Sequence, residues 1–88
     1  MIFLFELGFA DDWDIPYSKM DAAQKERVWK KIQHLKMLQK ARHLKRDLPY
    51  FVVETGQYRV AFKEKGKKRT IHFAGNPKQY EKWYKQFE

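Results

Sequence analysis

Cysteine is absent from the sequence, which excludes disulfide bonds and thiolate metal sites and fits a reducing compartment. Glycine and proline are few, with four and three residues in a chain of 88, and no repeat, linker or low-complexity tract is visible. We therefore expect a single domain spanning residues 1–88, with one modest core. The apolar opening MIFLFELGF is too short to cross a bilayer and lacks the basic start and cleavage site of a signal peptide. The expectation is a cytoplasmic protein that does not contact a membrane.

Basic residues are missing from the first 18 positions, which hold four acidic residues, so all 19 Lys and Arg residues lie in 19–88. The formal net charge of the chain is +8. A field of this sign attracts nucleic acid, acidic proteins or anionic lipid, and it carries no information about the fold.

The central feature is a stretch rich in β-branched and aromatic residues, 50–74, which predicts three strands joined by tight turns at Gly56 and Gly66. Side chains alternate between the two faces of a strand. One face is expected to be buried under helices and to carry Val60, Phe62, Ile71 and Phe73. The opposite face is expected to be open and cationic, with Arg59, Lys63, Thr70 and His72.

Helices are predicted both before and after these strands in the sequence. Asp21 followed by Gln24 is typical of a helix start, and an apolar stripe continues the helix from Ala22 to about Lys40. The stripe consists of Val28, Ile32, Leu35 and Leu38. Asn76 and Pro77 are typical of the start of a last helix over 78–87.

Two further elements are expected near the start of the chain. Residues 2–7 are almost continuously apolar, which predicts a strand that is central or covered on both faces. Residues 10–17 could form a short helix that Pro16 ends. The predicted fold is α+β, in the order β-α-α-β-β-β-α, with an antiparallel meander sheet packed by helices mainly on one face.

Several short motifs in a fixed order carry a resemblance to the RelE/ParE toxin superfamily across nearly the whole chain. They are Arg42-His43-Leu44, Leu48-Pro49, Gly56-Gln57-Tyr58-Arg59-Val60 and Phe73-Ala74-Gly75 followed by Lys78 and Tyr80. The resemblance implies the RelE/ParE-like fold and the toxin of a type II toxin–antitoxin pair, so a cognate antitoxin protein is an expected partner. RelE-like members cut mRNA in the ribosomal A site, which makes the ribosome and mRNA further partners. ParE-like members inhibit DNA gyrase instead.

The resemblance also implies roles for individual residues. Arg59 matches the arginine that stabilises the phosphate in RelE-like toxins, and Tyr80 or Tyr84 matches their C-terminal tyrosine. The chain departs from RelE at the two catalytic lysines, whose positions hold Val52 and Glu54. A second basic residue expected after the third strand falls near Pro77, beside Lys78 as a possible substitute.

RNA cleavage by the 2′-hydroxyl needs a base, an acid for the leaving 5′ oxygen, and cations on the phosphorane. Arginine and lysine can supply that charge, so no metal and no small-molecule cofactor is expected. The candidate catalytic residues are Arg59 as phosphate clamp, Glu54, His72 or His43 as base, and Tyr80 or Lys78 as acid or stacking group. The candidate RNA-binding residues are Arg42, His43, Lys45, Arg46, Lys63 and Lys68, and the basic run Lys67 to Arg69 strengthens the same hypothesis.

Each of these residues also has a purely structural interpretation. Arg59 could pair with Glu54 across the hairpin, His72 could be an ordinary surface residue, and Tyr80 could belong to the apolar stripe of the last helix. Two functional alternatives follow: a ParE-like gyrase inhibitor without nuclease activity, and a catalytically inert RNA- or antitoxin-binding domain of the same fold.

Overall fold

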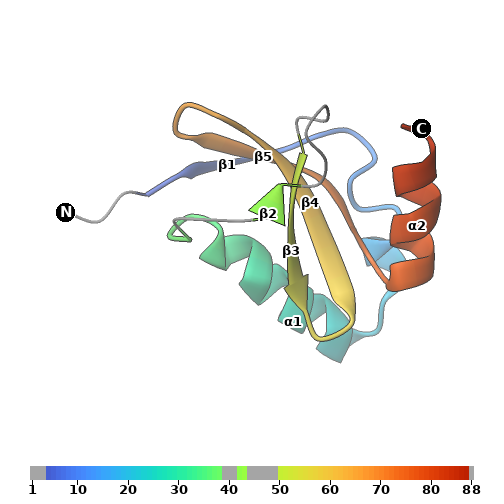
Figure 1. The fold of residues 1–88 in the computed structure, drawn as a ribbon. Coiled ribbons are helices and arrows are strands. Elements are labelled where there is room, and N and C mark those ends of the chain that lie inside the picture. Colours follow the sequence, from blue (N-terminus) through green and yellow to red (C-terminus); the bar gives the residue numbers. More distant parts are fainter. Residues whose placement is uncertain (1–3, 39–41, 44–49, 88) are drawn as a thin grey trace.

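The computed structural model describes residues 4–38, 42–43 and 50–87. Its elements follow the order β1 (Glu6–Phe9), the 3-10 helix η1 (Tyr17–Lys19), α1 (Ala22–His34), β2 (Arg42–His43), β3 (Tyr50–Thr55), β4 (Tyr58–Lys65), β5 (Lys68–Gly75) and α2 (Pro77–Lys85). The strands form one sheet in the order β1-β5-β4-β3-β2 (Figure 1). The α+β class is therefore confirmed.

The three-stranded meander is also confirmed. Strands β3, β4 and β5 pair antiparallel in sequence order. Their connecting turns contain Gly56 and Gly66, both at a φ of +59°. Glycine adopts that conformation without the steric cost that a Cβ imposes, so the two turns could be located from the sequence.

The first strand differs from its prediction. It covers Glu6 to Phe9, pairs in parallel with β5, and forms one edge of the sheet. The expectation of a central or doubly covered strand at residues 2–7 was wrong for its described part, because Leu4 is exposed and the pairing begins only at Glu6. The predicted helix over residues 10–17 is absent. Turns occupy residues 11–16, Asp12 has a φ of 66°, and the short η1 begins at Tyr17.

A β-bulge changes which residues face the core. Ala61 pairs with Phe73 and Phe62 pairs with Ile71, so His72 is an extra residue in β5. Because one inserted residue reverses the alternation, Phe73 points to the face opposite Ile71. The prediction that both would be buried on the same face was wrong.

Two core clusters result, one on each face of the sheet. On one face, α1 packs Val28, Ile32 and Leu35 against strand residues that include Val60 and Phe62. On the other face, α2 packs Tyr80 against a cluster formed with Val52, Ala61 and Phe73. The two helices therefore lie on opposite sides of the sheet (Figure 1), which corrects the expectation that they lie mainly on one face.

Both helix starts were predicted correctly. The backbone N–H of Gln24 donates to Asp21 Oδ1 at 2.8 Å, and the backbone N–H of Gln79 donates to Asn76 Oδ1 at the same distance. In α2 the backbone N–H of Asn76 also donates to Gln79 Oε1, which completes a capping box. However, α1 ends at His34 rather than near Lys40.

Candidate functional site

Three of the predicted catalytic residues meet at one end of the sheet. Glu54 and Arg59 lie directly opposite each other on β3 and β4, and Arg59 Nε is 3.7 Å from Glu54 Oε1. The Arg59 guanidinium also lies over the Tyr80 ring, with its central carbon 4.9 Å from the ring centroid. The capping box at Asn76 starts α2 immediately beside this strand end, so the first turn of the helix carries Tyr80 onto Arg59.

The exposure of these side chains differs in a way that bears on chemistry. The Arg59 and Glu54 side chains are 35% and 47% exposed, whereas Tyr80 is 7% exposed. A buried aromatic ring under a partly exposed guanidinium holds the cation in place while leaving part of it accessible to an anion. Tyr84 neighbours Tyr80, with ring centroids 6.1 Å apart, and the Arg59 guanidinium lies over the Tyr80 ring.

Lys78 lines a shallow cleft next to this cluster. The cleft has a volume of about 420 Å³ and is formed by the β3–β4 turn and the start of α2, with Gln57, Tyr58, Asn76, Pro77 and Lys78 as lining residues. Gln57 and Tyr58 directly precede Arg59 in the chain, and Pro77 and Lys78 begin α2, the helix that carries Tyr80. The Lys78 side chain is exposed at the first turn of α2.

His72 lies apart from Arg59. Gly75 is opposite Arg59, and His72 is three residues earlier on β5, roughly 10 Å away at normal strand spacing. The imidazole packs edge-on against the Tyr50 ring, with centroids 5.3 Å apart. Partial burial lowers the pKa of His72 below its ordinary value, and the nearby charge of Lys63 lowers that pKa further.

The predicted RNA-binding residues are only partly described. Lys63 lies over the Tyr50 ring at 5.1 Å, and Lys68 is exposed at the start of β5. Arg42 and His43 form β2, which pairs with β3 at the other sheet edge, while their side chains lie outside the described part. Lys45 and Arg46 also lie outside the described residues.

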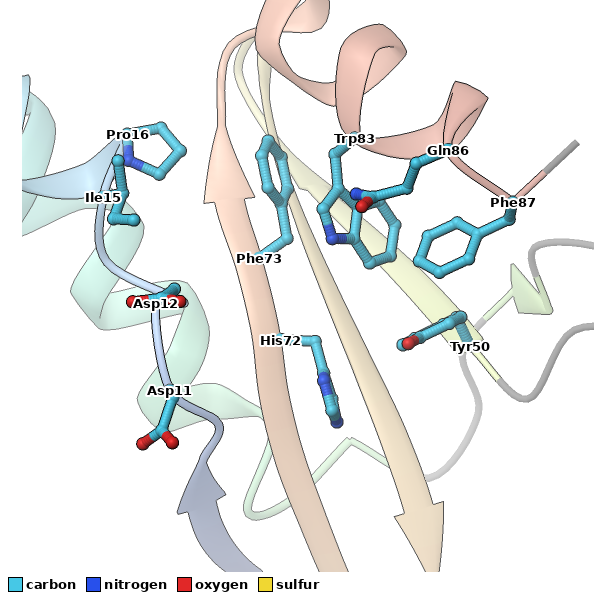
Figure 2. Close-up of a pocket in the computed structure, with 10 residues that line it drawn as sticks. All are labelled: Asp11, Asp12, Ile15, Pro16, Tyr50, His72, Phe73, Trp83, Gln86 and Phe87. Carbon is cyan, nitrogen blue, oxygen red and sulfur yellow. The ribbon is translucent and has the colours of Figure 1, made fainter.

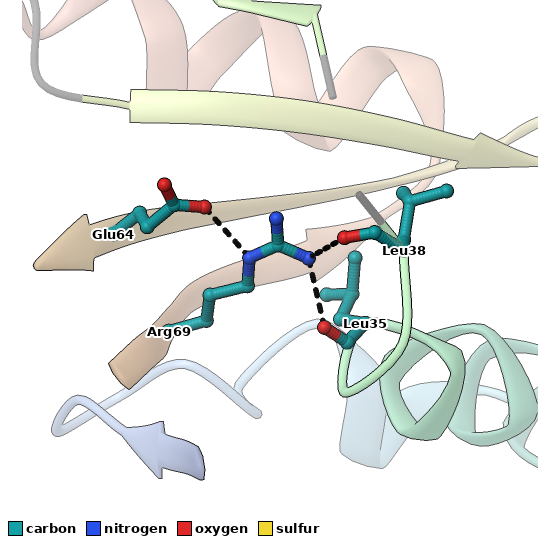
Figure 3. A network of polar contacts seen from close by, with 4 residues as sticks. All are labelled: Leu35, Leu38, Glu64 and Arg69. Atoms are coloured by element: carbon teal, nitrogen blue, oxygen red, sulfur yellow. Dashed lines mark hydrogen bonds and ion pairs between the residues drawn. The ribbon is translucent and has the colours of Figure 1, made fainter. Parts of the chain in front are cut away.

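Arg69 does not belong to a cationic surface, contrary to the prediction for the run Lys67 to Arg69. Its side chain is 1% exposed, and Nε is 2.8 Å from Glu64 Oε1. Nη1 donates to the backbone carbonyl oxygens of Leu35 and Leu38 at 2.8 and 2.6 Å (Figure 3). These bonds capture carbonyl groups just beyond α1 and explain why the helix stops short of Lys40. The alternation of side chains along the predicted third strand puts Arg69 on the same face as the apolar Ile71. This pattern was the signal in the sequence that Arg69 is buried.

A second cleft, about 450 Å³ in volume, was missed by sequence reasoning. It lies over β5 between the segment at residues 11–16 and α2 (Figure 2). Its lining residues are Asp11, Asp12, Ile15, Pro16, Tyr50, His72, Phe73, Trp83, Gln86 and Phe87. The only sequence signal was the acidic opening of an otherwise basic chain, which does not reveal that this segment faces the last helix.

Comparison with known proteins gives no match to a family model, a curated protein or a solved structure. The resemblance to the RelE/ParE superfamily therefore rests on the order of short motifs. Within the described ranges, no helix is long and apolar enough to span a membrane. The same residues contain no group of three or more His, Asp or Glu side chains that could hold a metal ion.

Proposed function

We propose that this protein is a RelE-like toxin that cleaves mRNA on the ribosome and thereby blocks translation. The observation that carries the proposal is the position of Arg59, partly exposed and held over the Tyr80 ring beside Glu54. A guanidinium can bind two phosphate oxygens at once, and its charge is most useful where negative charge develops in the transition state.

The proposed reaction is attack of the RNA 2′-hydroxyl on the adjacent phosphorus. A 2′-O–P bond forms while the P–O5′ bond breaks, which leaves a 2′,3′-cyclic phosphate and a 5′-hydroxyl. Arg59 binds the non-bridging oxygens of the phosphorane. The proton of the 2′-hydroxyl goes to Glu54, because this carboxylate is the base candidate that lies beside Arg59.

The leaving 5′ oxygen also needs a proton. Lys78 is assigned to this role because it is exposed on the first turn of α2, two residues before Tyr80, whose ring contacts Arg59. Tyr80 is assigned a positioning role, since its buried ring supports the guanidinium. His72 has no role in this step because it lies three residues before Gly75, the residue of β5 that pairs with Arg59.

The test is an in vitro translation reaction with primer extension on the mRNA. We expect cleavage at A-site positions that requires ribosomes and falls roughly 10²–10³-fold in Arg59→Ala, the cost typical of losing one transition-state donor. Arg27→Ala removes an exposed arginine from α1 and serves as the matched control, with cleavage unchanged. Intact mRNA with the unsubstituted protein would contradict the proposal, as would full cleavage by Arg59→Ala.

Gyrase inhibition is a second candidate, favoured by the two positions where RelE has catalytic lysines. Val52 is buried beneath α2, and Glu54 is an acid, so neither supplies a cation. A toxin that acts by binding gyrase would need neither lysine. Loss of DNA supercoiling by gyrase, together with uncut mRNA, would favour this function over RNA cleavage.

A further inference from the structure

The cleft between residues 11–16 and α2 has the size and composition of a ligand site. Its volume of about 450 Å³ lies within the range of small-molecule sites. Figure 2 shows Trp83 and Phe87 projecting from α2 on one side and Ile15 and Pro16 on the other, with Phe73 between them. Ile15 is 53% exposed, so the side of the cleft formed by Ile15 and Pro16 is not part of the core.

The β-bulge brings Phe73 to the same sheet face as His72, so both side chains line this cleft. In a regular strand, Phe73 would share the face of Ile71 and would point away from the cleft. Bulges often re-aim a side chain beside a functional site. Because the pKa of His72 is lowered, its imidazole is neutral at neutral pH and offers one hydrogen-bond donor and one acceptor.

The two ends of the cleft carry opposite charges. Asp11 and Asp12 stand at one wall, and within the described part of the chain no hydrogen bond or ion pair engages either carboxylate. Beyond the other wall, Lys63 lies over the Tyr50 ring and its charge acts on His72. A ligand that donates N–H groups at one end and carries negative charge at the other would satisfy both.

We propose that this cleft binds one nucleotide of single-stranded RNA, with the base stacked on Trp83, its amino edge at Asp11 and Asp12, and its phosphate toward Lys63. The proposal rests on the proposed function, in which RNA is the substrate. Flipped bases are commonly held between aromatic and apolar side chains and read at their Watson–Crick edge. The site lies on the same sheet face as Arg59, so one strand of RNA can contact both.

Guanine fits the acidic wall best. Its Watson–Crick edge places two adjacent N–H donors in reach of one carboxylate, whereas uracil presents one N–H between two carbonyl oxygens that the carboxylates repel. An arginine or lysine side chain of a protein partner is the competing occupant. The positive charge of Lys63 disfavours such a cation, and the stacking wall suits a planar base.

The test measures the binding of two fluorescent 2′-O-methyl pentanucleotides, UUGUU and UUUUU, at low salt. The 2′-O-methyl group prevents cleavage, so the result does not depend on catalysis. We expect UUGUU to bind roughly tenfold more tightly, as one bidentate base contact provides. In Asp11→Asn/Asp12→Asn this ratio should fall to about one. Asparagine tolerates the positive φ of residue 12, so the turn is kept.

Asp14→Asn is the matched control, because it removes a charge from the same segment outside the cleft. It should leave the ratio unchanged, even if both affinities rise through the loss of one negative charge. Arg59→Ala should weaken both oligonucleotides and also keep the ratio. A ratio near one in the unsubstituted protein, or a ratio that survives the double substitution, would overturn the cleft proposal while leaving ribosomal cleavage untouched. Competition by arginine amide, lost in the double variant, would reassign the cleft to a protein partner.

Discussion

Two Glu–Arg pairs occupy equivalent positions in the meander and have different surroundings. Glu54 lies opposite Arg59 in the β3–β4 hairpin, and Glu64 lies opposite Arg69 in the β4–β5 hairpin. The Arg69 guanidinium is buried, bonded to Glu64 and two carbonyls, and packed 3.7 Å from the Phe5 ring centroid. The Arg59 side chain is 35% exposed, and its Nε is 3.7 Å from Glu54 Oε1.

The difference arises from the face of the sheet on which each pair lies. Arg69 is on the α1 face, where its guanidinium donates to two carbonyl groups just beyond the end of α1. Arg59 is on the α2 face, where Tyr80 supports it from beneath and solvent reaches it from above. The same residue pair therefore joins a helix to the sheet in one place and offers a cation to an anion in the other.

The largest effect on stability is expected from Arg69→Ala. It would leave the carbonyl groups of Leu35 and Leu38 without their donor, which typically costs about 1–3 kcal/mol of unfolding free energy for each buried group, and it would remove the partner of the partly exposed Glu64. Arg59→Ala removes a partly exposed pair and should cost less than about 1 kcal/mol. Urea unfolding of the two variants measures both values. Equal losses of unfolding free energy would show that the two arginines contribute alike to stability, which contradicts the difference in their burial.

A smaller effect on stability is expected from protonation of His72, which lies on the same sheet face as Arg59 and is partly buried. Its pKa in the folded state lies below the ordinary value of 6.5, so the unfolded chain binds a proton more readily. The stability that the neutral imidazole provides is present above about pH 6.5 and is lost as the pH falls through the folded pKa.

Thermal unfolding between about pH 7.5 and pH 5 tests this sign. The fall in Tm on acidification should be shallower in His72→Gln than in the unsubstituted protein, because the titrating group is gone. His34 and His43 are present in both proteins, so their contribution cancels. A steeper fall in the variant would mean that protonation of His72 stabilises the fold.

Local features were predictable from the sequence, and features that depend on distant contacts were not. The turns at Gly56 and Gly66 and the caps at Asp21 and Asn76 depend on neighbouring residues alone, and all four were located correctly. The bulge at His72 was missed because an inserted residue leaves a regular apolar alternation in the sequence.

The dependence on distant contacts also explains why the end of α1 was predicted wrongly and why the cleft beside α2 was missed. The early end of α1 depends on Arg69, which is 34 positions away from Leu35 in the chain. Arg59, Glu54 and Tyr80 were chosen from a motif and do lie together. The cleft residues Asp11 and Asp12 were not chosen, because only the folded chain brings their segment beside α2.

The central claim is that Arg59 is available to a phosphate and Arg69 is not. The most direct measurement is NMR of the arginine Nε–Hε groups during titration with 2′-O-methyl UUGUU. We predict that the Arg59 signal moves and saturates with the RNA, while the Arg69 signal keeps its position. Movement of the Arg69 signal, or an unchanged Arg59 signal while RNA binds elsewhere on the protein, would contradict it.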